Sequence, residues 1–299
     1  MEITNIKEAL TFLYHISVDK NENYYFRGQC NVEWKIIPSV FRTYRRYQSV
    51  FYEDLLLEIK PKLPEVLYTS LDIEWLMLCQ HYGLATRLLD WTSDILTALF
   101  FACDSQTEEL KSKDGIIYIC NQNDFKKFSL YDKNIRTSEE LAFINTYITN
   151  PRIRSQNGCF MIWGHEETEV YDLEKYIEIH KKSPLKKIIV PSKYKERILI
   201  ELNEKYNINR ETIYLENSKV NFINENWKNL AENLRNLTFY ITEASKVSNS
   251  IKKEIEKNFE ASFSDMFGEC ANLRLVMLRD FTHFFTKEKI NLFLRKENQ

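Results

Sequence analysis

The sequence predicts an α+β fold, a mixed sheet with surrounding helices, followed by a C-terminal all-helical extension. Up to about residue 216, short segments rich in β-branched and aromatic residues alternate with segments of helical period. Beyond that point the chain becomes rich in lysine and asparagine and shows helical periods alone. The composition, 44% hydrophobic with only six glycines and six prolines, is typical of a globular protein with a real core. We therefore expect an α+β domain over residues 1–216 and a helical extension over residues 217–299.

The first elements follow from local patterns. Residues 5–17 repeat apolar positions at helical spacing and predict an amphipathic helix. The aromatic run at 24–29 favours a strand, and residues 34–37 favour a second short strand that Pro38 ends. Residues 45–60 carry apolar side chains at helical spacing, which predicts the next helix.

Two helices are predicted on either side of a short polar loop. The first covers residues 70–84, with Gly83 where a left-handed C-terminal cap would fall. The second covers residues 94–105, and Thr92 or Ser93 could cap its N-terminus.

The remaining elements of the α+β part come from the same rules. The apolar run at 115–120 predicts a buried strand, and Thr137 with Glu140 forms a capping-box pattern ahead of a helix over 140–148. Four further segments follow: an extended segment over 150–164, a strand over 185–191, a helix over 192–206 and a strand over 212–216.

Charge and cysteine usage exclude several classes of protein. The net charge of −2 gives no overall basic excess of the kind that nucleic-acid-binding proteins show. The six cysteines form no C-x-x-C pair and lie in apolar surroundings, as buried reduced thiols do: Cys30, Cys79, Cys103, Cys120, Cys159 and Cys270. The longest apolar run is far shorter than the roughly 20 residues that span a bilayer, and residues 1–17 do not resemble a signal peptide. We expect a cytoplasmic protein without a membrane segment or a metal.

The polar loop between the two predicted helices is the first candidate site. Arg87 offers a planar charged group suited to phosphate, Trp91 offers a flat face for a base, and the N–H groups that begin the next helix favour an anion. The alternative is a structural cluster in which Arg87 pairs with Asp90, Asp90 or Thr92 caps the helix, and Trp91 packs in the core.

The second candidate is the pair Arg27 and Gly28 on the strand predicted at 24–29. An arginine that projects from a strand suits a phosphate, and a glycine lets the backbone approach a ligand closely. The alternative is a surface charge, or an arginine paired with a carboxylate.

The third candidate lies in the extended segment predicted over 150–164. Arg152, Arg154 and Gln156 are spaced by two, so on a strand they would share one face and could form one wall of a site for an anion. An exposed polar strand face is the alternative. His81 falls at a helix end, where it can act as a cap, and the sequence shows no P-loop, G-x-G-x-x-G or zinc-helix pattern.

These stretches together resemble the FRG domain family of bacteria and phages, named for a Phe/Tyr-Arg-Gly motif. The resemblance covers about residues 20–216 and rests on "YYFRGQCNVEWKIIPSVFR", "EWLMLCQHYGLATRLLDWTSDILTALFFA", "NPRIRSQNGCFMI" and the strand–helix–strand pattern that begins with "KKIIVPSKY". It implies that Arg27, Arg87 and Gln156 line one site for a nucleotide or another phosphorylated ligand.

The order of the motifs is also similar to that of ADP-ribosyltransferases, in which an arginine anchors NAD and a later glutamate polarises the ribose. By this analogy Arg27 and Gln156 are the catalytic candidates, with Asp90 or Glu166 in place of the missing glutamate. The residues expected to bind the cofactor NAD are Arg27, Gly28, His81, Thr86, Arg87, Trp91, Thr92 and Arg154. The implied function is that of an ADP-ribosyltransferase-like toxin or effector in anti-phage defence.

A non-catalytic module that binds nucleic acid or a partner protein is the rival interpretation. Its contact surface would be the helices of residues 217–299, which carry an apolar stripe that could pack on the main domain, form a dimer or hold a partner. Lysines there alternate with acids, a pattern more typical of a solvated helix face than of a phosphate-binding surface.

Overall fold

The structure is a computed structural model of the 299-residue chain. It describes residues 1–18, 23–43, 53, 57, 71–81, 85–132, 135–136, 138, 140–145, 151–164 and 171–215. The chain divides into two compact units, one formed by residues 1–42 and 87–217 and the other by residues 43–86 and 218–299. We call the first the sheet unit. The helical extension predicted after residue 216, and most of the helix predicted over 45–60, lie outside the described residues.

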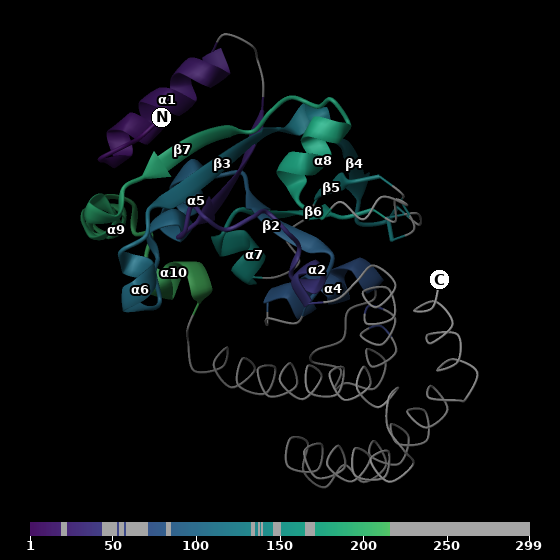
Figure 1. The fold of residues 1–299 in the computed structure, drawn as a ribbon. Coiled ribbons are helices and arrows are strands. Elements are labelled where there is room, and N and C mark those ends of the chain that lie inside the picture. The colour runs from purple at the N-terminus through teal and green to yellow at the C-terminus, as the bar shows by residue number, and fades with distance from the viewer. Residues whose placement is uncertain are drawn as a thin grey trace, which may run out of the picture. The chain divides into compact units, whose positions relative to one another are not determined.

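The described strands of the sheet unit form one mixed sheet, which confirms the α+β fold class (Figure 1). The strand order is β4-β5-β6-β2-β1-β3-β7. Neighbouring strands are antiparallel, apart from the parallel pair β4 and β5. The strands are β1 Tyr24–Gln29, β2 Leu88–Thr92, β3 Gly115–Asn121, β4 Lys126–Ser129, β5 Ala142–Asn145, β6 Gly158–Ile162 and β7 Lys186–Val190.

Helices of very different length accompany this sheet. The described ones are α1 Ile6–Val18, α2 Ser39–Thr43, α5 Ile95–Cys103, α6 Glu108–Lys111, α7 Pro151–Ser155, α8 Leu173–Ile179, α9 Ser192–Tyr206 and α10 Arg210–Tyr214, with the short 3-10 helix η3 at Gln122–Asp124. The helix α4, Asp72–His81, belongs to the second unit. Among the described helices none is long and apolar enough to cross a membrane.

The main core lies on the face of the sheet that α5 covers. Figure 1 shows α5 crossing this face, with α1 and α9 at the β7 side of the sheet. Buried side chains of α1, α5 and α9 pack there against those of β1, β3 and β7. Because side chains alternate along a strand, Phe26 of β1 contributes to this face, whereas Arg27 projects from the other.

The opposite face holds a cluster of aromatic rings around Phe143 of β5. The ring centroid of Phe143 lies 4.6 Å from that of Tyr25 and 5.8 Å from those of Trp91 and Phe125. All four side chains are buried. Aromatic pairs at such distances stabilise a fold beyond the area they bury, so both faces of the central strands are packed.

The approach of α5 to β1 depends on the glycine of the motif. A Cβ atom placed on Gly28 would lie 1.9 Å from the carbonyl oxygen of Ala98 and 2.8 Å from the nitrogen of Ala102. Gly115 of β3 lies equally close to α5, since its Cβ would meet the Ala102 carbonyl oxygen at 2.1 Å. Gly28 therefore makes room for the backbone of a helix, where we expected it to make room for a ligand.

Most of the predicted elements are confirmed. The structure contains the helices expected at 5–17, 70–84, 94–105 and 192–206 and the strands expected at 24–29, 115–120 and 185–191, with ends shifted by a few residues. Gly83, the expected cap of the second of these helices, lies outside the described residues.

Two segments that we expected as loop or helix are strands. Residues 88–92 form β2, because all five pair with β6 in the middle of the sheet. Residues 142–145 form β5 between β4 and β6, so pairing within the sheet overrides the local helical pattern that Glu140 begins.

Three other segments, which we expected as strands or as extended chain, are not strands. Residues 34–37 form no strand, residues 151–155 form the helix α7, and residues 210–214 form the helix α10. Proline at the first position favours α7, and the left-handed Asn157, with φ 44°, ends the turn that follows it. A capping box between Asn209 and Thr212 begins α10.

Candidate functional site

Arg27 is the best-defined candidate, because it lies at the centre of the sheet and projects from the face opposite α5. Its Nη1 atom donates a hydrogen bond of 2.6 Å to the backbone carbonyl of Asp90 in β2. Phe26 and Thr92 are the one residue pair that the two described strands hold in register. Beyond that pair, a side-chain guanidinium connects β1 to β2.

The charge around Arg27 is only partly compensated. The Asp90 carboxylate lies 3.9 Å from Nη1; the Asp90 side chain is 48% exposed, whereas the Arg27 side chain is 13% exposed. Burial is the main cause that lowers the pKa of Arg27 below its ordinary value; Asp90 opposes this shift and the nearby Arg42 of α2 adds to it. Partial desolvation by the surrounding protein also lowers the pKa of Arg42, although the residue is exposed, and Asp90 again opposes the shift. Two guanidinium groups thus share the field of one half-exposed carboxylate.

Tyr118 of β3 closes the other side of this site, because it is the cross-strand partner of Arg27. Burial raises the pKa of Tyr118 to about 12, and Glu174 and Asp172 add to the shift, while Arg27 lowers it. Lys187 lies over the Tyr118 ring, 5.7 Å from its centroid, and pairs with Glu174 of α8.

Three buried polar atoms on this face have no hydrogen-bond partner in the described part of the chain. They are Nε of Arg27, Oε1 of Gln29 and Nε1 of Trp91. Most buried polar groups in proteins are hydrogen-bonded, so such a group needs an explanation. We call Arg27, Gln29, Trp91 and the adjacent Arg42, Asp90 and Tyr118 the β1–β2 site.

Arg87 does not belong to this site. Its side chain is buried, and it donates hydrogen bonds of 2.8 and 3.1 Å to the backbone carbonyls of Trp163 and Arg136. The nitrogen of Trp163 in turn donates to the carbonyl of Arg87. The guanidinium therefore joins the start of β2 to the segments that follow β6 and precede β5. Arg87 therefore has a structural role, as in the alternative of a structural cluster, but its partners are backbone carbonyls and not Asp90.

The N-terminus of α5 already has an anion of its own. The carboxylate of Asp94, not Thr92 or Ser93, accepts hydrogen bonds from the nitrogens of Leu96 and Thr97. Thr92 accepts one from the nitrogen of Asp94 and donates a hydrogen bond of 2.7 Å to the carbonyl of Gln156. The positive end of the helix therefore faces a carboxylate of the chain itself.

Gln156 lies on the α5 face of the sheet, away from Arg27. Its amide nitrogen donates to the carbonyl of Ile213, a core residue of α10. The one-face arrangement of Arg152, Arg154 and Gln156 is wrong because residues 151–155 are helical. Arg152 lies over the ring of Tyr214, 5.1 Å from its centroid, and Arg154 is exposed.

The remaining predicted residues are placed as follows. Trp91 is on the same face as Arg27, but its ring is only 3% exposed and packs edge-on against Phe143. Thr86, in the second unit, donates a hydrogen bond of 2.6 Å to the side chain of Gln80. The side chain of His81 lies outside the described residues. From the predicted set the structure therefore brings together Arg27 and Asp90, and it places Trp91 on the same face as Arg27.

Sequence reasoning missed Gln29, Arg42 and Tyr118. Gln29 had a signal, since it follows Arg27 by two residues on a predicted strand and so shares its face. Tyr118 had no such signal, because neither segment alone predicts the register in which β1 pairs with β3.

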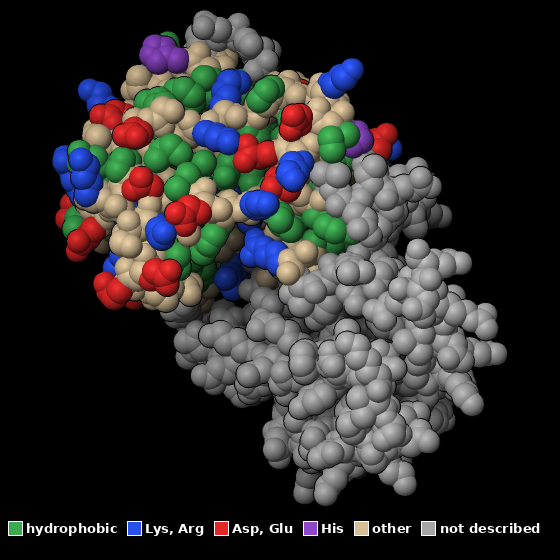
Figure 2. All heavy atoms as spheres, viewed as in Figure 1, with side chains coloured by type: hydrophobic (Ala, Val, Ile, Leu, Met, Phe, Trp, Pro, Cys, Tyr) green, Lys and Arg blue, Asp and Glu red, His purple; other side chains and the backbone are tan. Residues whose placement is uncertain are grey.

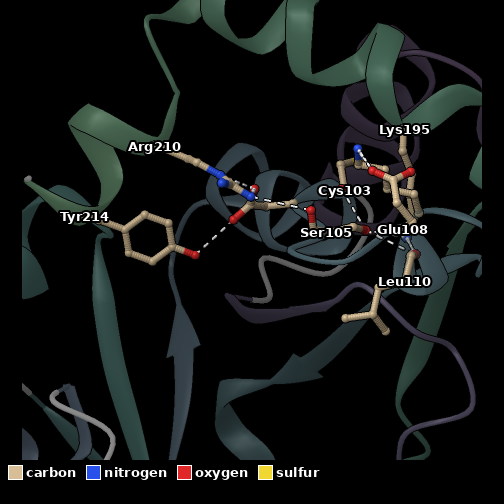
Figure 3. A network of polar contacts seen from close by, with 9 residues as sticks. Cys103, Ser105, Glu108, Leu110, Lys195, Arg210 and Tyr214 are labelled. Atoms are coloured by element: carbon tan, nitrogen blue, oxygen red, sulfur yellow. Dashed lines mark hydrogen bonds and ion pairs between the residues drawn. The ribbon is translucent and has the colours of Figure 1, made fainter. Parts of the chain in front are cut away.

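A second polar cluster lies at the ends of α5, α9 and α10, and Figure 3 shows its members turned toward one another. Asp104 accepts hydrogen bonds of 2.7 Å from Arg210 and 3.1 Å from Tyr214. The Lys195 ammonium, buried in the same region, donates to the carbonyls of Cys30 and Leu110 and to the hydroxyl of Ser105. Burial lowers the pKa of Lys195. These contacts join α5, α6, α9 and α10 to one another and to the end of β1, which is a structural role.

The surface in Figure 2 carries acidic and basic side chains interspersed over the described residues. Within those residues no group of three or more His, Cys, Asp and Glu side chains is arranged to hold a metal ion.

Comparison with known proteins gives one finding. Residues 22–111 match the model of the FRG domain family. This range contains β1 and β2, and with them Arg27, Gln29, Arg42, Asp90 and Trp91. No curated protein and no solved structure matches the chain.

Proposed function

We propose that the FRG domain of this chain binds a phosphorylated ligand, of the nucleotide class, at the β1–β2 site. The observation that carries the proposal is the guanidinium of Arg27, which lies mostly buried with its Nε atom lacking a hydrogen-bond partner among the described residues. A buried guanidinium costs free energy unless a charged or hydrogen-bonding partner compensates it. Phosphate oxygens supply both the charge and the acceptor.

Arg42 strengthens the case for an anion of more than one charge. It is exposed, and it lies close enough to Arg27 and Asp90 to affect and respond to their charges. Asp90 neutralises at most one of the two guanidinium groups. A pyrophosphate group, with two negative charges or more, would restore the balance.

NAD and ADP fit this donor set. Their pyrophosphate would be held by Arg27 and Arg42, and Trp91 Nε1 is a further donor on the same face. If NAD is the ligand, it supplies a glycosidic bond from ribose to a positively charged nicotinamide, which is a good leaving group.

The proposal is tested by calorimetric titration with inorganic pyrophosphate, ADP and NAD. We expect wild type to bind, and Arg27→Met and Arg42→Met each to weaken pyrophosphate binding by about 10-fold or more, as the loss of a charge-assisted hydrogen bond does. Arg197→Met, at an exposed position of α9, is the matched control and should bind as wild type does. Unaltered affinity in Arg27→Met and Arg42→Met would refute the proposal.

ADP-ribosyl transfer is a second candidate function, favoured by the place of Asp90. Its carboxylate lies beside the proposed phosphate anchor and is half exposed. It could therefore supply the negative charge that the amide of Gln156, bonded to Ile213, does not. In this reaction the bond from ribose to nicotinamide breaks, neutral nicotinamide leaves, and water or a side chain of a target forms the new bond to ribose.

Release of nicotinamide from labelled NAD tests this second function. We expect Asp90→Asn to abolish release while the protein still binds pyrophosphate. If wild type binds NAD and releases no nicotinamide, the domain is a binding module, as the rival interpretation holds. A role as an NAD-consuming effector in anti-phage defence makes a further prediction. During infection, cells that express Asp90→Asn should keep their NAD and should no longer be protected from the phage.

Binding of nucleic acid remains a prediction for residues 217–299, which lie outside the described residues. It would weaken steeply as salt rises, because counterions are released when phosphates are neutralised. The interspersed charges on the face in Figure 2 offer no extended basic surface for it there.

A further inference from the structure

Gln29 and Trp91 are the buried polar side chains of the β1–β2 site whose end groups have no partner within the described ranges. Their exposed fractions are 5% and 3%. Gln29 presents an acceptor, the amide oxygen Oε1, whereas Trp91 presents a donor, the indole Nε1.

The two groups flank Arg27 on one face of the sheet. Gln29 follows Arg27 by two residues in β1, a distance of roughly 7 Å along a strand, and Trp91 lies on the neighbouring strand β2, which pairs with β1 only at Phe26 and Thr92. Trp91 comes one residue before Thr92, and Arg27 one residue after Phe26, the single registered pair. The unpartnered groups therefore border the stretch where β1 and β2 are joined by the Arg27 guanidinium.

An anion alone does not satisfy this set. Phosphate oxygens accept hydrogen bonds from Arg27 Nε and Trp91 Nε1, but a fully ionised phosphate has no hydrogen to donate to Gln29 Oε1. A buried acceptor left without a donor costs free energy. The ligand that satisfies all three groups carries a hydrogen-bond donor next to its phosphate.

We propose that Gln29 is a specificity-determining residue of the site, which selects phosphorylated ligands that present a hydroxyl or N–H donor beside the phosphate. This inference rests on the proposed function and extends it from an anion to a ligand class. A ribose hydroxyl and the N–H group of a base both supply such a donor. Pyrophosphate supplies neither.

The test compares three probes, inorganic pyrophosphate, ribose 5-phosphate and ADP, by calorimetry with wild type and Gln29→Met. Methionine keeps the length and apolar contacts of glutamine and removes the acceptor. We expect the affinity for ADP to fall about 10-fold, which corresponds to the loss of one buried hydrogen bond, and the affinity for pyrophosphate to stay unchanged. An equal fall for ribose 5-phosphate would assign the donor to the sugar, and a fall for ADP alone would assign it to the base.

Gln122→Met is the matched control, since Gln122 lies near the opposite end of β1, where its amide donates to the carbonyl of Tyr24. It should leave all three affinities unaltered. Unchanged ADP and ribose 5-phosphate affinities in a folded Gln29→Met, as a buried water at Oε1 would give, overturn the inference while the phosphate site stands. Absence of binding of all three probes to wild type overturns the proposed function and this inference together.

Discussion

The guanidinium of Arg27 donates a 2.6 Å hydrogen bond to the main-chain carbonyl of Asp90, and the carboxylate of the same aspartate lies 3.9 Å from the same nitrogen. The first contact does not depend on the side chain at position 90. The second does, and it is electrostatic. A substitution at this position can therefore change the charge of the site without breaking the connection between β1 and β2.

Asp90→Asn should strengthen the binding of pyrophosphate about 2- to 5-fold, because it removes a negative charge that competes with the ligand. The effect is small because the carboxylate is half exposed and solvent screens it. Titration calorimetry at low and high salt measures it, and the gain should shrink as salt rises. The control Glu196→Gln removes an exposed carboxylate on α9 and should have no effect. Weaker binding in Asp90→Asn would mean that Asp90 itself contacts the ligand.

The sequence predicts the α+β class and the elements whose own patterns are strong. The helices predicted at 5–17, 94–105 and 192–206 follow from clear helical periods, and the apolar run at 115–120 favours a buried strand by its composition. Residues 88–92 and 142–145 are short, and their strand state comes from pairing with β6. Such pairing joins residues far apart in the chain, which no local pattern encodes.

The sequence predicts only part of the candidate site, again because strand pairing between distant segments is not encoded locally. The alternation of side chains places Arg27 and Gln29 on one face of β1 from the sequence alone. The proximity of Asp90 and Tyr118 requires the strand order β2-β1-β3, which is a tertiary fact. Arg87 and Gln156 match the motif by residue type. Their hydrogen bonds, however, go to backbone carbonyls, those of Trp163, Arg136 and Ile213, and no sequence motif predicts such acceptors.

Gly28→Ala should destabilise the sheet unit by about 3 kcal/mol or more, or prevent folding. The new Cβ would lie 1.9 Å from the Ala98 carbonyl oxygen, and backbone atoms cannot move aside as a side chain can. Gly158→Ala is the matched control, since its nearest neighbour would be the Ile153 carbonyl oxygen at 3.3 Å. We expect the control to change the free energy of unfolding by only about 1 kcal/mol. Chemical denaturation followed by circular dichroism compares the two, and equal stability would show that α5 can shift away from β1.

Tyr118→Phe should flatten the pH dependence of stability above pH 10. The folded pKa of Tyr118 is raised from 10.0 to about 12, chiefly by burial. Between these values the unfolded state loses the phenolic proton and the folded state keeps it, so the free energy of unfolding falls as pH rises. Two pKa units correspond to about 3 kcal/mol.

Denaturation midpoints at several pH values from 9 to 12 measure this effect as the difference between wild type and Tyr118→Phe. Tyr25→Phe provides a parallel case, since burial also raises the pKa of Tyr25 to about 12. Identical pH dependence in wild type and Tyr118→Phe would show that the phenol ionises without unfolding the protein.

Lys195→Met should destabilise the sheet unit by about 2 to 3 kcal/mol. The ammonium donates hydrogen bonds of 2.6, 3.2 and 3.3 Å to the Cys30 carbonyl, the Ser105 hydroxyl and the Leu110 carbonyl, and its side chain is buried. Methionine fills a similar volume but leaves these acceptors without that donor, and the loss exceeds the gain from removing a buried charge. Lys193→Met, two residues earlier on α9 and exposed, should change the free energy of unfolding by about 0.5 kcal/mol or less.

Because Cys30 directly follows β1, loss of its hydrogen bond from Lys195 should also loosen the end of the strand that carries Gln29. Hydrogen exchange at the amides of Gln29 and Cys30 would then quicken in Lys195→Met and not in Lys193→Met, whereas equal exchange in both variants would confine the role of Lys195 to the helices.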